Sequence, residues 1–151
     1  MEKQKYNTIL VPVDGSKQAT LALKKAIATT KRNGEKARLY IVHIIDPQLF
    51  KNIGTFDQSM VEEAATNANT VLQEYVEEAK QAGVKNVEYI VEYGLPKSLI
   101  AKEMPQKIQA DLIIMGATGL GSVERVFIGS VTDYVIRTAN IDVLVIKNNK
   151  E

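Results

Sequence analysis

Five short apolar runs, each about as long as a β-strand, alternate with longer segments of helical periodicity along this chain. The predicted strands cover residues 6–13, 38–45, 86–92, 111–115 and 142–147. The predicted helices cover residues 17–33, 57–81, 95–103 and 131–137. Such alternation favours a parallel sheet with helices on both faces. Because 151 residues are one domain's worth, we predict a single doubly wound α/β domain, residues 1–151, around five parallel strands.

Capping and breaking residues set the predicted boundaries of the helices. Ser16 is a typical N-cap for the first helix, and Gly34 and Gly83 end the first and second helices. Pro105 is expected to break the helical pattern before the fourth strand. The helical period predicts buried stripes in the first two helices. Their members are Ala19, Leu23, Ala26, Ile27 and Thr30, then Met60, Ala64, Ala68, Val71, Leu72, Tyr75, Val76 and Ala79. Residues 46–55 are predicted to form an irregular loop.

The composition excludes several classes of function. Nineteen basic and eighteen acidic side chains leave a formal charge of +1, so no global field attracts nucleic acid or a membrane. The absence of cysteine excludes disulfides, thiolate metal sites and thiol nucleophiles. The chain has no run of apolar residues long enough to span a bilayer and no apolar signal segment at its start. We therefore expect a soluble cytoplasmic protein.

A glycine-rich segment follows the fourth predicted strand. It comprises Gly116-Ala117-Thr118-Gly119, and Gly129-Ser130 then precedes the last predicted helix. A glycine-rich turn between a strand and a helix brings backbone N–H groups to the positive end of a helix dipole. This arrangement is typical of a phosphate site. The segment therefore predicts a nucleotide or another phosphorylated ligand.

A second polar segment, Asp14-Gly15-Ser16, follows the first predicted strand. In doubly wound sheets, ligands bind where the order of the strands reverses, outside their carboxyl ends. The first and fourth strands are the natural neighbours of that crevice, so both polar segments point to one site. A structural interpretation stays open for each: the first segment as a turn and helix cap, the glycines as turn residues, and Gly129-Ser130 as an N-cap. His43, the single histidine, is interpreted as a structural or crevice-lining residue.

These residues resemble the universal stress proteins that bind ATP. The resemblance is carried by residues 11–16 (Val-Pro-Val-Asp-Gly-Ser), by residues 112–116, and by the closing apolar run 143–146. Its most specific part is the pattern Gly-x2-Gly-x9-Gly-Ser, which runs from Gly116 to Ser130. The resemblance covers essentially the whole chain. It implies a Rossmann-like fold, similar to the adenine nucleotide alpha hydrolases, with strand order 3-2-1-4-5 and ATP in the crevice.

The resemblance also implies roles for individual residues. Asp14 and Gly116 would contact the ribose, and the backbone of Val13 and Val42 would frame the adenine. The phosphates would be held by Gly119, Gly129, Ser130 and Val131. Mg²⁺ or Mn²⁺ would be carried mainly by the phosphates. Arg125 is a further candidate phosphate contact, although a solvated loop charge is the favoured interpretation.

The last predicted strand, residues 142–147, is almost entirely apolar and is expected at an edge of the sheet. Exposed apolar edges need covering or pairing. The resemblance implies a homodimer in which the two last strands meet.

The sequence lacks the motifs of familiar catalytic sites. It contains no Gly-x4-Gly-Lys-Ser/Thr and no Gly-x-Ser-x-Gly, and one histidine without cysteine leaves few ways to build a nucleophilic triad. The leading hypothesis is an ATP-binding regulator or sensor of the stress response. Two alternatives remain open: a weak ATP hydrolase or related adenylyl-transfer enzyme, and a dimeric interaction module that binds no nucleotide.

Overall fold

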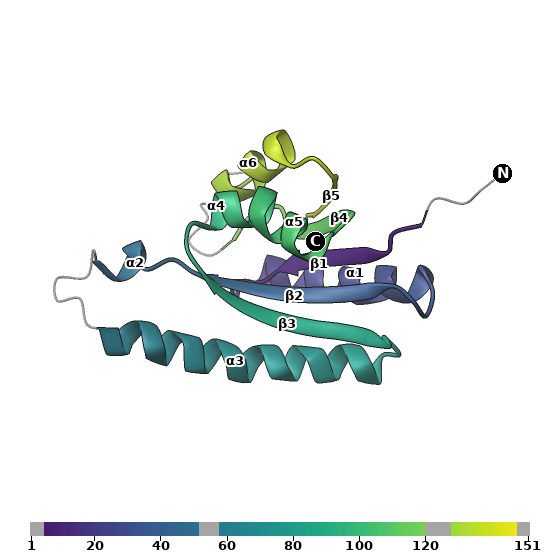
Figure 1. Cartoon of the computed structure of the whole chain (residues 1–151), viewed down its shortest axis with the longest axis horizontal. Helices are drawn as coiled ribbons and strands as arrows, with labels where there is room; N and C mark the ends of the chain where they lie inside the picture. The colour runs from purple at the N-terminus through teal and green to yellow at the C-terminus, as the bar shows by residue number, and fades with distance from the viewer. Residues whose placement is uncertain (1–4, 52–57, 120–127, 148–151) are drawn as a thin grey trace.

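The computed structural model describes residues 5–51, 58–119 and 128–147. Its centre is a five-stranded sheet in the order β3-β2-β1-β4-β5, with every neighbouring pair parallel (Figure 1). The strands are β1 (Thr8–Pro12), β2 (Arg38–Ile45), β3 (Asn86–Tyr93), β4 (Leu112–Gly116) and β5 (Asp142–Ile146). The predicted fold class and strand order are confirmed.

The helices lie between the strands. They are α1 (Lys17–Arg32), α2 (Gln48–Lys51), α3 (Gln58–Gln81), α4 (Pro96–Ser98), α5 (Met104–Ile108) and α6 (Ser130–Thr138). Of these, α1, α3, α4 and α6 lie where helices were predicted. A π-helical segment, Leu99–Glu103, joins α4 to α5. No helix in the described ranges is both long and apolar enough to cross a membrane.

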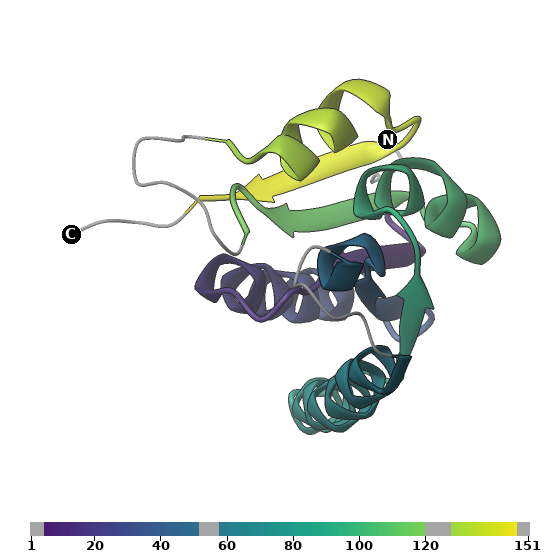
Figure 2. The same cartoon turned by 90° about the vertical axis from the view of Figure 1, so that its left-hand side faces the viewer.

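The helices form two layers on opposite faces of the sheet (Figure 2). On one face, α1 packs against β1 and β4, while α3 packs against β2 and β3. On the other face, the segment from α4 to α5 and α6 enclose a second apolar core. Because both faces are covered, the central strands β1 and β4 are almost wholly buried.

The predicted stripe of α1 is confirmed, because all of its members are buried. The stripe of α3 is partly wrong. Val61 is buried where Met60 was expected, and Val71 is 40% exposed. The buried positions of α3 are Val61, Ala68, Leu72 and Ala79. Val71 lies one residue, and therefore about 100° of rotation, from the centre of that stripe.

Pro105 does not break the helical segment after β3, contrary to the prediction. Proline lacks an N–H group, so an α-helical bond to the carbonyl four residues earlier is lost at this position. The backbone adapts by widening just before it, where the N–H of Met104 donates to the carbonyl of Leu99. The helical turns then continue to Ile108. A π turn of this kind absorbs the proline without ending the helix.

The region predicted as the loop 46–55 contains a short helix, α2. Asp46 starts it, because its Oδ1 accepts the N–H of Gln48 at 2.9 Å. Asp46 thus acts as a helix-initiating acceptor, which the prediction of an irregular loop missed. Residues 52–57 lie outside the described residues.

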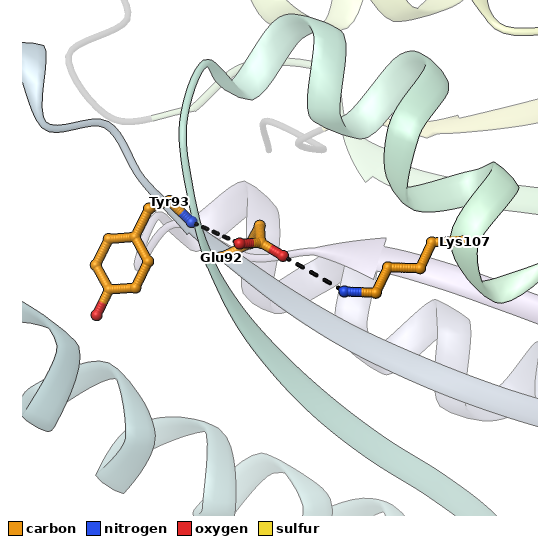
Figure 3. Close-up of polar contacts among 3 residues, drawn as sticks. All are labelled: Glu92, Tyr93 and Lys107. Atoms are coloured by element: carbon orange, nitrogen blue, oxygen red, sulfur yellow. Dashed lines mark hydrogen bonds and ion pairs between the residues drawn. The ribbon is translucent and has the colours of Figure 1, made fainter.

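Strands β3 and β5 form the two edges of the sheet. At the end of β3, the Glu92 carboxylate accepts the N–H of Tyr93 at 3.2 Å and lies 3.7 Å from Nζ of Lys107 on α5 (Figure 3). Charged side chains on an edge strand discourage pairing with another strand. The β3 edge of the sheet is therefore charged, whereas the β5 edge is apolar.

Candidate functional site

The site predicted from the sequence lies at the carboxyl ends of β1 and β4. These two central strands are neighbours, with Ile9 opposite Leu112 and Leu10 opposite Ile113. The chain adds β2 on one side of β1 and β4 on the other, so the order of the strands reverses between them. The segments that follow β1 and β4 therefore meet at the edge where doubly wound folds bind ligands.

The segment after β1 is a tight turn that ends in a helix cap. Gly15 has a φ of 86°, a conformation that favours glycine. Oδ1 of Asp14 accepts the N–H of Ser16 at 3.0 Å, and Oγ of Ser16 accepts the N–H of Ala19 at 3.1 Å. The predicted N-cap at Ser16 is therefore confirmed. The same turn holds the Asp14 carboxylate just beyond the carboxyl end of β1.

Asp14 faces the glycine segment that follows β4. A Cβ atom added to Gly119 would overlap Oδ2 of Asp14, closer than side chains approach in real proteins. Gly119 therefore leaves the space that the carboxylate occupies. The polar segment after β1 and the glycine segment after β4 are therefore in contact, as their places after neighbouring strands predicted.

The N-terminus of α6 completes the arrangement. Gly129 is the N-cap of α6, without a side-chain cap, and its N–H donates to the carbonyl of Ala117 at 2.7 Å. A Cβ on Gly129 would lie 3.4 Å from Cα of Thr118 and 3.8 Å from the N atom of Gly119. The N–H groups of Ser130 and Val131 belong to the first turn, where a helix has no internal acceptor for them. Gly119, Gly129, Ser130 and Val131 thus lie in one neighbourhood, with exposed Ser130 at the positive end of the helix dipole.

Thr132 is a structural residue of the site that the sequence analysis missed. Its buried hydroxyl donates to the carbonyl of Gly116 at 2.8 Å, which fixes the first turn of α6 to the end of β4. The signal in the sequence was a threonine two residues after Ser130. A hydroxyl in the first turn of a helix normally suggests a local cap, and here it reaches another strand.

Gly116 has a packing role that the sequence analysis did not include. A Cβ at this position would lie 2.8 Å from Cβ and 3.0 Å from the carbonyl carbon of Gln18 in α1. Glycine therefore allows α1 to lie directly against β4. Gly116 is itself buried, so little of its surface is open to the ribose contact predicted for it.

The predicted base-binding residues are already joined to one another. The N–H of Val13 donates to the carbonyl of Val42 at 2.8 Å, and Nδ1 of His43 lies 2.8 Å from the carbonyl of Val13. Since a carbonyl only accepts, Nδ1 carries the proton in this bond. The side chain of Val42 is 1% exposed, and the next residue on that face of β2, Ile44, is half-buried. A base at this position would therefore meet backbone atoms of Val42 rather than its side chain.

Two further predictions concern charge. Arg125 lies outside the described residues. The described ranges contain no group of three or more histidine, cysteine, aspartate or glutamate side chains that could hold a metal ion.

The described residues also line a hollow of about 80 Å³ beside Lys31, Gly34 and Gly83. It lies near the amino ends of the strands, away from the carboxyl ends of β1 and β4. Nucleotide-sized pockets measure roughly 300–1,000 Å³. This hollow is far too small for a nucleotide.

Comparison with known proteins agrees with the geometry. A model of the universal stress protein family matches residues 5–147. The chain belongs to the universal stress protein family. Among its relatives, a protein of Staphylococcus aureus strain USA300 assigned to the universal stress proteins is 41% identical over 145 residues, which are 96% of this chain and 86% of that protein.

Solved structures include close matches to this universal stress protein fold. Hypothetical protein MJ0577 superposes with a TM-score of 0.86 at 28% identity, over 98% of this chain and 100% of that one. Universal stress protein UspA from Lactobacillus plantarum gives a TM-score of 0.82 at 28% identity, over 95% and 99% of the two chains. A universal stress protein solved in complex with cAMP gives 0.70 at 25% identity, over 95% and 98%.

Proposed function

We propose that this universal stress protein binds ATP in the crevice between β1 and β4 and acts as a nucleotide-dependent regulator. One observation carries the proposal: the Asp14 carboxylate, the glycine segment after β4 and the N-terminus of α6 converge in one place. Each supplies a different chemistry that a nucleotide requires. The match to a relative solved with cAMP supports adenine nucleotides as the ligand class.

The phosphates would lie at the N-terminus of α6. Backbone N–H groups of Gly119, Ser130 and Val131 and the Ser130 hydroxyl would donate to phosphate oxygens, with the helix dipole adding positive potential. Gly129 keeps this surface clear of side-chain atoms, because its Cβ would project over the backbone of Thr118 and Gly119. Mg²⁺ or Mn²⁺ bound to the phosphates would neutralise the remaining charge.

The ribose and base would lie toward β1 and β2. Asp14 is an acceptor suited to ribose hydroxyl groups, and it already stands beside Gly119. The backbone of Val13 and Val42 would border the adenine, with half-buried Ile44 beside them. The hydrogen bond from His43 to Val13 would hold this border in place.

A regulatory role fits the chemistry of the crevice better than catalysis. Asp14 is the carboxylate that the described residues place at the glycine segment, and its Oδ1 already accepts the N–H of Ser16. The sequence contains no P-loop lysine to stabilise a transferred phosphoryl group. Slow ATP hydrolysis is the second candidate, and turnover assays separate it from binding.

Isothermal titration with ATP, ADP and cAMP, each with and without Mg²⁺, tests the proposal. We expect ATP with Mg²⁺ to bind, and Gly129→Val to abolish binding while far-UV circular dichroism stays unchanged. Lys85→Gln, an exposed change beside the amino ends of the strands, is the matched control and should bind as the wild type does. Absence of binding by the wild type to all three nucleotides would refute the proposal and favour the nucleotide-free interaction module.

We also propose a homodimer formed through β5. Leu144 on this edge strand is 37% exposed, and Ile136 on the neighbouring helix α6 is 43% exposed. Both would be covered if two β5 strands met. In about 1 M NaCl, which screens contacts between exposed charges, light scattering should give twice the monomer mass for the wild type and the monomer mass for Leu144→Lys. A wild type that is monomeric at micromolar concentration would refute this dimer.

A further inference from the structure

The exposed side of α1 carries only positive charge. Its sixteen residues include five basic and no acidic side chains. The basic residues, all exposed, are Lys17, Lys24, Lys25, Lys31 and Arg32. None of the three ion pairs found in the described ranges includes a residue of α1. Leu21 is 37% exposed and lies beside Lys17 and Lys24, at helical spacings of four and three residues.

The exposed side of α3 has the opposite charge. Its exposed charged residues are Glu62, Glu63, Glu74, Glu77, Glu78 and one lysine, Lys80. Lys80 lies 3.9 Å from Glu77 at the end of the helix, so the other four glutamates keep the surface negative. Val71 is 40% exposed and lies on the flank of α3, beside the row that carries Glu63 and Glu74. Both helices thus present a charged row with an exposed apolar residue in it or beside it.

The two helices lie on the same face of the sheet and run in the same direction. Both pack into one core, and both end at the amino edge of the sheet, where Cε of Lys31 lies 3.2 Å from the Cβ position of Gly83. Their charges also match in spacing. Lys17 and Lys31 are separated by the same number of residues as Glu63 and Glu77, about 21 Å along a helix axis.

This arrangement has a consequence under two-fold symmetry. Consider a two-fold axis that lies between two copies, parallel to this face and to the helices. It places α1 of one copy on α3 of the other, and α3 of the first on α1 of the second. An axis at right angles to the helices would instead set α1 on α1 and α3 on α3, where like charges repel. Electrostatics therefore selects the first arrangement.

We propose that a second copy of this chain docks on this face, with α1 of each protomer against α3 of its partner. The contact is isologous and lies on a different surface from β5. It consists of two sets of lysine–glutamate pairs, with Leu21 and Val71 beside them. A nucleic acid is the less suitable occupant, because a polyanion lying across the face would meet the glutamates of α3.

Charge reversal tests this interface. In Lys17→Glu/Lys24→Glu/Lys31→Glu, the net charge of α1 changes from +5 to −1, so both helices are acidic. In Glu63→Lys/Glu74→Lys/Glu77→Lys, the net charge of α3 changes from −4 to +2, so both helices are basic. Each variant should fail to associate through this face, whereas an equimolar mixture should form a heterodimer. Both are built on Leu144→Lys, so that association through β5 does not add to the mass. Sedimentation velocity should show about a twofold higher mass for the mixture than for either variant alone.

Two controls accompany the mixture. Lys97→Glu/Lys102→Glu/Lys107→Glu makes the same change of charge on the opposite face of the sheet, and it should self-associate like the parent variant, Leu144→Lys. Raising NaCl to about 1 M, where the Debye length is about 3 Å, should dissociate the parent and the mixture. A mixture that stays at the monomer mass overturns the proposal. A second pair of results would also overturn it: the mass of the parent does not change with salt, and charge reversal on α1 abolishes binding to a fluorescent DNA oligonucleotide. Those results would identify α1 as a surface that binds polyanions.

Discussion

The carboxylate of Asp14 and the backbone of Gly119 lie so close that a methyl group on Gly119 would overlap Oδ2 of Asp14. Asp14 begins the turn after β1, and Gly119 belongs to the segment after β4. Their contact joins the ribose side of the proposed site to its phosphate side. A substitution at either residue should therefore displace the other and so weaken nucleotide binding.

Gly119→Ala should lower ATP affinity by about tenfold, equivalent to about 1.4 kcal/mol, because the new methyl group displaces the Asp14 carboxylate. The thermal midpoint should change little, since the overlapping atom is the end of a flexible side chain. The loss should not add to that of Asp14→Ala, because both changes remove the same carboxylate. Titration calorimetry on the two single variants and the double variant gives the coupling. Fully additive losses would show that the two residues act independently.

Gly116→Ala should destabilise the fold by about 1–3 kcal/mol, because its methyl group would meet the backbone of Gln18 and push α1 away from β4. Urea unfolding measures the loss. Gly129→Ala is the matched control, because Gly129 has a φ of −72° and its Cβ would make an ordinary contact. We expect that control to stay within about 0.5 kcal/mol of the wild type. Equal losses in the free energy of unfolding for the two variants would contradict the packing role of Gly116.

Thr132→Val should also destabilise the protein by about 1–3 kcal/mol, because it leaves the buried Gly116 carbonyl without its hydroxyl donor. Thr132→Ser keeps the donor and should recover most of this loss. ATP affinity should follow the same order, since the bond positions the first turn of α6. If serine and valine variants prove equally unstable, the hydrogen bond is not what Thr132 contributes.

Tyr6→Phe should make stability less sensitive to alkaline pH. The hydroxyl of Tyr6 donates to Asp142 at 2.6 Å, and this bond, together with burial and the charges of Asp142 and Asp111, raises the pKa of Tyr6 above its ordinary 10.0. The unfolded chain therefore ionises first, so stability present below pH 10.0 is lost as pH rises through the folded pKa. Urea midpoints of both proteins across this range test the effect. Parallel curves for the two proteins would contradict it.

Much of the fold could be predicted because its signals are local. Apolar runs located every strand, and Ser16 and Gly34 placed the ends of α1 within one residue. Pro105 misled the prediction because a π turn depends on the packing of Leu99 and Met104, which a helix-breaking rule does not include. Val71 was misplaced because a hydrophobic period defines a stripe but not its exact centre.

The candidate site followed from the sequence only in part. Asp14, Gly119 and Gly129 are marked by turn chemistry and spacing, and the fold brings them together. The bond from Thr132 to Gly116 and the contact of Gly116 with Gln18 could not be predicted, because each joins segments whose approach depends on the assembled sheet. The buried side chain of Val42 likewise becomes evident only when the second core is formed.

The most direct test of nucleotide binding is mass spectrometry of small molecules released when freshly purified protein is denatured. We expect ATP or ADP from the wild type and none from Gly119→Val/Gly129→Val, with matching circular dichroism spectra for the two proteins. Release of the same nucleotide from the double variant would place the ligand elsewhere. No nucleotide from the wild type, together with no binding of added ATP and Mg²⁺, would contradict the central claim.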